Sequence, residues 1–194
     1  MDRYDPATAL IVVDVQNDFA DPAGSLSVPG GAEVVPLVNA EIADALAAGG
    51  RVFYTQDWHP PSTPHFQKDG GIWPVHCVAG TWGAELHPDL RVDGPVVRKG
   101  VHGEDGYSGF MTRDPESGEE RPTELGELLR AAAVERLVVV GLATDYCVLA
   151  TALDARARDF PTTVLTAAVR AVDLQPGDGA RALATLSEAG VSLD

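Results

Sequence analysis

Basic residues are scarce in this sequence of 194 residues. Lysine and arginine together number 14, against 29 aspartates and glutamates, which gives a formal net charge of −15 at pH 7. A protein with this balance repels phosphate groups, so the composition argues against a nucleic-acid or anionic-membrane partner. It fits a protein that handles neutral or small substrates, without identifying one.

Cysteine is also scarce, since only Cys77 and Cys147 occur. The chain therefore lacks the Cys-x-x-Cys pair of thiol redox proteins. No apolar run is long enough to cross a membrane, and the run from Leu10 to Val13 is too short for a signal peptide and has no basic flank. We expect a cytoplasmic protein with two free thiols, although the sequence alone leaves a disulfide between them open.

Internal repeats and low-complexity linkers are absent as well. Hydrophobic residues make up 45% of the chain and charged residues 22%, as in ordinary globular proteins. A chain of this length most simply builds one core. We therefore expect a single domain over residues 1–194.

Short, unbroken apolar runs alternate with stretches of helical periodicity. The runs predict buried strands at residues 9–13, 52–55, 96–99, 137–140 and 162–165, with a short sixth at 191–193. Helices are expected near residues 34–46, 125–129, 148–153 and 180–187, whereas residues 15–32, 57–95 and 100–121 are expected to be irregular. This alternation predicts an α/β fold, an open parallel sheet of about six strands with helices on both faces.

Polar residues follow four of the predicted strands, and ligands bind at the carboxyl ends of strands in such sheets. These residues are Asp14, Asp57, His59, Lys99 and Cys147. Taken singly, Asp14 could be a turn or cap residue and Lys99 a solvated surface residue. Their location at one edge of the sheet favours a functional site. Functional sites are where charged groups lie beside a helix N-terminus, an arrangement that shifts their pKa values.

Cys147 lies in the first turn of the helix that follows the strand at 137–140. Thr144 and Asp145 are residue types that cap helix N-termini. The positive end of the helix dipole would stabilise a thiolate at Cys147. The alternative is a structural thiol, because free cysteine is among the most buried residue types.

Three of the five histidines lie within twenty residues of one another, beside an aspartate. Asp57 and His59 flank one residue and point to the same side of an extended segment, and His65 and His76 follow. One carboxylate and three imidazoles form a donor set that zinc, iron or manganese accepts. A single histidine in a Pro-rich loop would be an ordinary surface residue, but this cluster favours one divalent metal ion.

Several motifs together resemble the nicotinamidases and pyrazinamidases of the isochorismatase-like cysteine hydrolase family. They run in family order over nearly the whole chain. The motifs are Asp14 to Phe19, Asp57 to His59, His65-Phe66, Trp73 to Cys77, Lys99-Gly100, Tyr107 to Phe110 and Gly141 to Val148. Two departures are Val75, where this branch often has a second proline, and an acidic tip near residues 114–121 that looks like extra length.

The resemblance implies a catalytic triad of Asp14, Lys99 and Cys147. Asp14 would take the thiol proton, Lys99 would favour the anionic partners, and the Cys147 thiolate would attack an amide carbonyl. The backbone N–H groups of Ala143 and Cys147 would form the oxyanion hole, after a cis peptide between Leu142 and Ala143.

The same resemblance implies a metal, most simply zinc, bound by Asp57, His59, His65 and His76. Phe19 and Trp73 would sandwich a flat ring, although core packing explains Trp73 equally well.

The implied activity is hydrolysis of nicotinamide and pyrazinamide-like aromatic amides to the acid and ammonia, in NAD salvage. The partner would be a small aromatic amide, and a homo-oligomer stays open. Rivals are another amide or ureido hydrolase of the same family, and a non-enzymatic metal-binding protein in which Asp14 and Lys99 would have no purpose.

Overall fold

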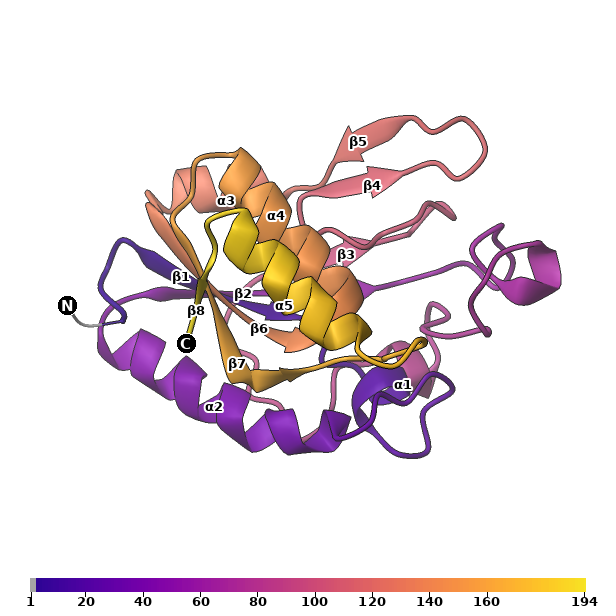
Figure 1. Ribbon diagram of the computed structural model, residues 1–194, viewed down its shortest axis with the longest axis horizontal. Helices are drawn as coiled ribbons and strands as arrows, with labels where there is room; N and C mark the ends of the chain where they lie inside the picture. The colour runs from indigo at the N-terminus through magenta and orange to yellow at the C-terminus, as the bar shows by residue number, and fades with distance from the viewer. Residues whose placement is uncertain (1–2) are drawn as a thin grey trace.

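A six-stranded sheet forms the centre of the computed structural model, which describes residues 3–194 (Figure 1). The strand order is β3-β2-β1-β6-β7-β8, and all neighbouring strands pair in parallel. Their bounds are β1 Thr8–Val13, β2 Arg51–Asp57, β3 Val96–Lys99, β6 Arg136–Leu142, β7 Thr162–Arg170 and β8 Ser192–Leu193. The predicted α/β class and its six-stranded parallel sheet are thus confirmed.

Helices cover both faces of the sheet, because successive side chains of each strand point to opposite faces. Leu10 and Val12 of β1 pack in the core beneath one helix, whereas Ile11 and Val13 pack beneath three others. Figure 1 shows α2 on one side of the sheet and α3, α4 and α5 on the other. The bounds are α2 Gly31–Ala47, α3 Leu125–Ala131, α4 Leu149–Ala157 and α5 Asp178–Glu188.

Three stretches that the sequence predicted to be irregular contain short regular elements. These elements are α1 Asn17–Ala20, the 3₁₀ turns η1 Gln67–Asp69 and η2 Trp82–Ala84, and an antiparallel hairpin of β4 Met111–Arg113 and β5 Glu120–Pro122. Their shortness explains the omission, because three or four residues give too little periodicity to detect. No helix among residues 3–194 has the length and apolar character needed to cross a membrane.

The strand order places a topological switch point between β1 and β6. The chain moves outward from β1 through β2 to β3, then returns to the other side of β1 with β6. Ligands bind outside the carboxyl ends of strands at such a point, where the two neighbouring loops diverge. Asp14 directly follows β1, and Cys147 lies in the segment after β6.

Gly141 allows β6 to lie against β1 at this end of the sheet. It pairs with Val13, and the register with β7 shifts between Val139 and Gly141. Its φ is +111°, and a Cβ atom at this position would lie 2.1 Å from the Val13 carbonyl oxygen. Both observations require glycine, because a side chain would strain the backbone and push the two strands apart.

We predict that Gly141→Ala lowers the free energy of unfolding by at least about 2 kcal/mol. Gly126→Ala in α3 is the matched control, because a Cβ there meets only one Phe110 ring atom, at 3.9 Å. Alanine suits a helix better than glycine, so the control should lose nothing and could gain up to about 1 kcal/mol. Urea unfolding of both variants tests this, and equal midpoints would refute the role given to Gly141.

Candidate active site

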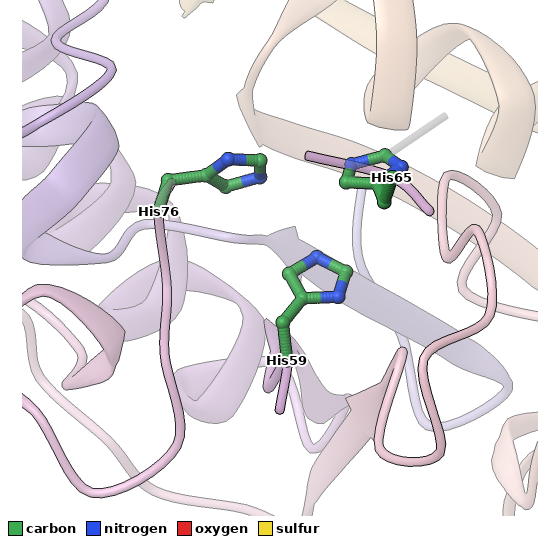
Figure 2. A group of neighbouring side chains, drawn as sticks. All are labelled: His59, His65 and His76. Atoms are coloured by element: carbon green, nitrogen blue, oxygen red, sulfur yellow. The ribbon is translucent and has the colours of Figure 1, made fainter. Parts of the chain in front are cut away.

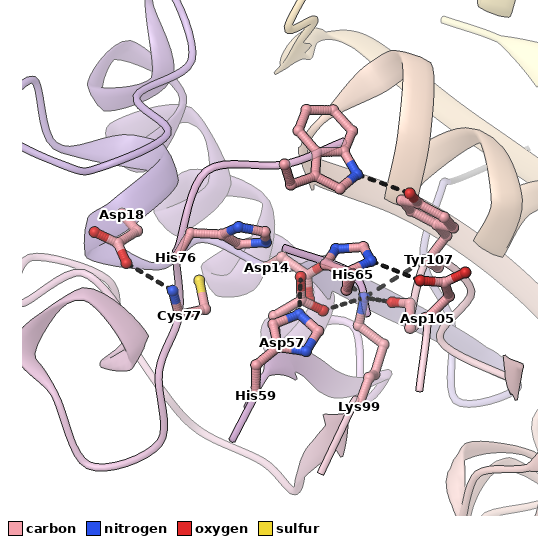
Figure 3. Close-up of polar contacts among 12 residues, drawn as sticks. Asp14, Asp18, Asp57, His59, His65, His76, Cys77, Lys99, Asp105 and Tyr107 are labelled. Atoms are coloured by element: carbon pink, nitrogen blue, oxygen red, sulfur yellow. Dashed lines mark hydrogen bonds and ion pairs between the residues drawn. The ribbon is translucent and has the colours of Figure 1, made fainter. Parts of the chain in front are cut away.

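The ends of β1, β2 and β3 bring the predicted polar residues to one edge of the sheet. Asp57 at the end of β2 is directly opposite Lys99 at the end of β3. Asp14 follows β1 at a φ of 47°, which turns its side chain toward them. The prediction that polar residues after the strands share one edge of the sheet is therefore confirmed for Asp14, Asp57 and Lys99, which lie close together in Figure 3.

A buried ion triad joins these residues. The Lys99 Nζ atom lies 2.7 Å from Asp14 Oδ2 and 2.9 Å from Asp57 Oδ1. Lys99 also donates to the Gly106 carbonyl, and Thr55 Oγ1 donates to Asp14 Oδ1 at 2.6 Å. All three charged side chains are excluded from solvent, so each is stabilised by protein groups instead of water.

The pKa shifts within the triad go in opposite directions. Burial raises the pKa of Asp14, despite the opposing charge of Lys99. Burial alone would raise the pKa of Asp57 too, but Lys99 and His59 lower it far below the usual range. Burial alone would lower the pKa of Lys99, but Asp14 and Asp57 raise it well above its ordinary value. Asp14 is therefore the carboxylate better suited to accept a proton, while Asp57 stays anionic and Lys99 cationic.

Cys147 reaches the triad from a π-helical turn, Thr144–Val148, that precedes α4. The sulfur and the carboxylates of Asp14 and Asp57 all lie within 4.8 Å of one another. Burial raises the pKa of the Cys147 thiol well above its ordinary value. Loss of hydration therefore opposes the thiolate expected at this helix terminus, and Lys99 is the neighbouring charge that favours it.

The predicted capping of this helix is wrong. The N-cap position belongs to Ala143, and no side chain caps the turn. The Asp145 carboxylate instead accepts hydrogen bonds from the backbone N–H groups of Val172 and Asp173, at 2.9 and 2.8 Å. Asp145 thus fastens the segment after β7 to the segment that carries Cys147. The peptide between Leu142 and Ala143 is cis, as the resemblance implied.

The three predicted histidine ligands converge beside the triad. His59, His65 and His76 are buried, and one ring nitrogen of each lies within 4.8 Å of the others (Figure 2). Nδ1 of His76 faces the Pro74 carbonyl oxygen at 2.8 Å, so this nitrogen carries the proton and Nε2 has the free lone pair. Burial lowers the pKa of His76 to about 4, which keeps the imidazole neutral and able to bind a metal at neutral pH.

The buried ring nitrogens of His59 show whether these residues fit a metal ion. Among residues 3–194, neither of its buried ring nitrogens has a hydrogen-bond partner. Its Nε2 atom lies 3.7 Å from Asp57 Oδ2, too far for a direct hydrogen bond. A buried imidazole with an unused lone pair beside an anionic carboxylate is the donor arrangement that a divalent cation satisfies. The residues therefore fit a metal.

The second acidic group at this edge does not suggest another metal site. Asp14, Asp57 and Cys147 also lie within 4.8 Å of one another. The ammonium group of Lys99 already lies between the two carboxylates and neutralises them.

An aromatic pocket borders the Cys147 sulfur and two of the histidines, His65 and His76. Trp73 is buried, and its indole N–H donates to the Tyr107 hydroxyl at 2.8 Å. The Trp73 ring meets Tyr146 edge to face, with the centroids 4.7 Å apart. The pocket is lined by Phe19, Leu26, Asp57, His65, Trp73, His76, Tyr107, Ala143, Tyr146, Cys147 and Val172. Trp73 is thus both a packed residue and part of the pocket wall.

Sequence reasoning gave no role to several residues that build this site. Gln16 forms hydrogen bonds with both backbone groups of Asp57, each at 2.8 Å, and so fixes the end of β2. Asp18 accepts from the Cys77 N–H at 2.7 Å, next to His76. Tyr107 and Tyr146 belong to recognised motifs, which was the available signal for them. Thr55 gave no signal, because a threonine in a strand is ordinary.

We predict that Lys99→Ala lowers the free energy of unfolding by about 3–5 kcal/mol, because it leaves two carboxylates buried without their cation. Lys68→Ala is the matched control, since Lys68 forms a 3.4 Å ion pair with Asp69 from a half-exposed position. That substitution should cost less than about 1 kcal/mol. Urea unfolding with a chelator present, so that no cation replaces the ammonium, tests both. A similar loss in the two variants would contradict the importance of the triad.

Comparison with known proteins agrees with this geometry. The isochorismatase domain model matches residues 8–192. The nicotinamidase of Escherichia coli is 37% identical over an alignment 206 positions long, which covers 97% of this chain and 94% of that protein. The pyrazinamidase of Pyrococcus horikoshii in complex with zinc superposes with a TM-score of 0.86 at 39% identity, over 97% of this chain and 99% of that one. A protein of L. infantum in complex with nicotinate gives 0.87 at 36% identity, over 97% and 92%. This chain belongs to the isochorismatase family.

Proposed function

We propose that this protein hydrolyses nicotinamide, and pyrazinamide-like aromatic amides, to the carboxylic acid and ammonia, a step of NAD salvage. The observation that carries the proposal is an aromatic pocket whose lining includes both Cys147 and the proposed metal ligands Asp57, His65 and His76. The Escherichia coli nicotinamidase and the nicotinate complex support the substrate class. Two buried free thiols suit a reducing compartment, so we propose the cytoplasm.

The proposed reaction begins with proton transfer from the Cys147 thiol to Asp14. The raised pKa of Asp14 makes it a better proton acceptor, and the cation of Lys99 stabilises the thiolate that forms. The thiolate then attacks the amide carbon, and the carbonyl becomes a tetrahedral oxyanion. The backbone N–H groups of Ala143 and Cys147 would bind this oxyanion, and such a donor is typically worth about 3 kcal/mol.

The carbon–nitrogen bond then breaks as Asp14 returns the proton to the leaving nitrogen, which departs as ammonia. A water molecule gives a proton to Asp14 and attacks the thioester. The acid is released when the sulfur regains its proton from Asp14, so one residue serves as base and acid in both halves.

Asp57, His59, His65 and His76 would hold one divalent ion, and zinc is the metal we propose. When bound, this ion supplies a Lewis-acid site for the ring nitrogen of the substrate. Phe19 and Trp73 both line this pocket, and they would contact the flat faces of the substrate ring.

We predict that Cys147→Ala and Cys147→Ser abolish turnover of nicotinamide, with a loss greater than about 10³-fold, because no other group can form the acyl intermediate. Cys77→Ser is the control. Its thiol is buried against the Gly83 carbonyl, away from the pocket, and should not affect the chemistry. Ammonia release measures all three variants. A Cys147→Ala protein that keeps a substantial part of the wild-type rate would exclude the covalent mechanism.

We also predict that the position of the ring nitrogen determines turnover. Nicotinamide and pyrazinamide place a nitrogen meta to the carbon that bears the carboxamide, whereas benzamide has none and picolinamide has it adjacent. The positions of the histidine cluster and of Cys147 are set by the fold. Only nicotinamide and pyrazinamide would therefore place a ring nitrogen at the metal while the carboxamide carbon reaches the Cys147 sulfur. Losing that contact should lower kcat/KM on the order of 10²-fold or more.

Ammonia release from the four amides, with and without a chelator, tests this prediction. If benzamide reacts within a few-fold of nicotinamide, the histidine cluster does not select the substrate. The alternative, another amide or ureido hydrolase of this family, would then be favoured.

A further inference from the structure

We propose that Asp105 is a positioning residue for His65, and that the β4–β5 hairpin holds it in place. The inference rests on the proposed function only in taking His65 as a metal ligand. Asp105 lies in the segment between β3 and β4 and belongs to no recognised motif. The acidic tip of the hairpin, near residues 114–121, was the part of the sequence without an assigned role.

The hydrogen bond between Asp105 and His65 is short, and His65 is its donor. Asp105 Oδ1 lies 2.6 Å from His65 Nδ1 (Figure 3). An ionised carboxylate can only accept a hydrogen bond, so the proton must lie on Nδ1 of His65. The free lone pair is then on Nε2, the remaining nitrogen of the ring. Asp105 therefore selects the tautomer in which His65 can bind a metal through Nε2.

The three histidines differ in what orients them. A neutral carbonyl, that of Pro74, orients His76, and His59 has no hydrogen-bond partner among the described residues. Only His65 donates to a charged carboxylate. A negative acceptor fixes the ring and strengthens its other nitrogen as a donor, as in carboxylate–histidine–zinc arrangements. Asp105 is half-buried, with a quarter of its side chain exposed, so its charge is only partly screened.

The hairpin supplies the fixed backbone that this contact needs. Arg113 of β4 pairs with Glu120 of β5 on one side. On its other side Arg113 exchanges two backbone hydrogen bonds with Asp105, at 2.8 and 2.9 Å. An isolated antiparallel bridge therefore fixes the backbone of Asp105 to the edge of this two-stranded sheet. Figure 1 shows this hairpin projecting beside the end of the main sheet.

A second link ties the Asp105 segment to the histidine loop. Thr63 Oγ1 donates to the Gly103 carbonyl at 2.7 Å and accepts from the His65 N–H at 3.2 Å. The backbone of His65 is thus held through Thr63, and its ring through Asp105. Removing the Asp105 carboxylate should free the ring while leaving the backbone in place.

The test measures zinc affinity of the full-length protein by competition with a chromophoric chelator. Asp105→Ala should weaken zinc binding about 10- to 100-fold, the usual effect of losing such a partner. Asp105→Asn, which keeps the shape and a neutral acceptor, should weaken it less. Glu116→Gln on the hairpin tip removes the same charge from an exposed position and should change nothing.

A second variant separates the hairpin strands from the charge of their tip. Because the Asp114 N–H donates to the Glu119 carbonyl at 2.8 Å, residues 115–118 can be replaced by Asn-Gly, with Asp114→Asn and Glu119→Gln, to give a two-residue hairpin turn without these acidic residues. Zinc affinity should stay within a few-fold of wild type, since the strand that holds Asp105 is retained. A loss equal to that of Asp105→Ala would mean that the acidic tip attracts the ion, which would overturn the positioning role.

The histidine tautomer gives a readout that does not need metal or activity. In ¹⁵N NMR spectra of the metal-free protein, His65 should carry its proton on Nδ1 in the wild type and become a tautomer mixture in Asp105→Ala. An unchanged spectrum would overturn the proposal, even if zinc affinity fell.

His65→Ala distinguishes failure of this inference from failure of the proposed function. If His65→Ala loses zinc affinity while both Asp105 variants keep it, only the positioning role is wrong. If wild type and His65→Ala bind zinc equally weakly, the proposed metal site itself is wrong, and this inference fails with it.

Discussion

The buried cation of Lys99 is the interaction on which the site depends. Its ammonium group lies between Asp14 and Asp57, to which we assign two proposed functions, nucleophile activation and metal binding. An ammonium buried without partners would be far too costly, and so would two carboxylates facing each other without a cation. The pairing register of β1, β2 and β3 must therefore be kept, because it places the three charged side chains together. A change that disrupts this pairing would disturb both the stability of the sheet and the chemistry of the site.

The same triad divides the work between two chemically identical side chains. Asp57 interacts with Lys99 and His59 and remains anionic, as its proposed role as a metal ligand requires. Asp14 is equally buried, and desolvation together with the charge of Asp57 raises its pKa despite Lys99, which makes it the better proton acceptor. Environment and not residue type thus assigns the roles, as in other enzymes that use two carboxylates differently. Burial raises the pKa of the Cys147 thiol beside them well above its ordinary value, and Lys99 is the charge that opposes this shift.

The segments that carry the histidines contain little regular structure, and side-chain hydrogen bonds hold them. Gln16 fixes Asp57, Asp18 fixes the chain next to His76, and Asp105 orients His65. Each of these side chains satisfies backbone or ring groups that no strand partner could reach, so a long loop can be as well defined as the sheet. The metal site is in this sense built by acidic and amide residues around it as much as by its own ligands.

The sequence by itself determined the sheet and its edge. Unbroken apolar runs such as residues 9–13 and 137–140 are typical of strands buried on both faces, and the residues after parallel strands share one edge. The clustering of three histidines near Asp57 is likewise visible in the sequence, where it predicts a metal site. Contacts between distant segments set the remaining properties: the opposite pKa shifts of Asp14 and Asp57, the raised pKa of the Cys147 thiol, the hydrogen bonds of Asp145 and the contact of Asp105 with His65. Burial and hydrogen bonding set these properties, and neither has a local pattern in the chain.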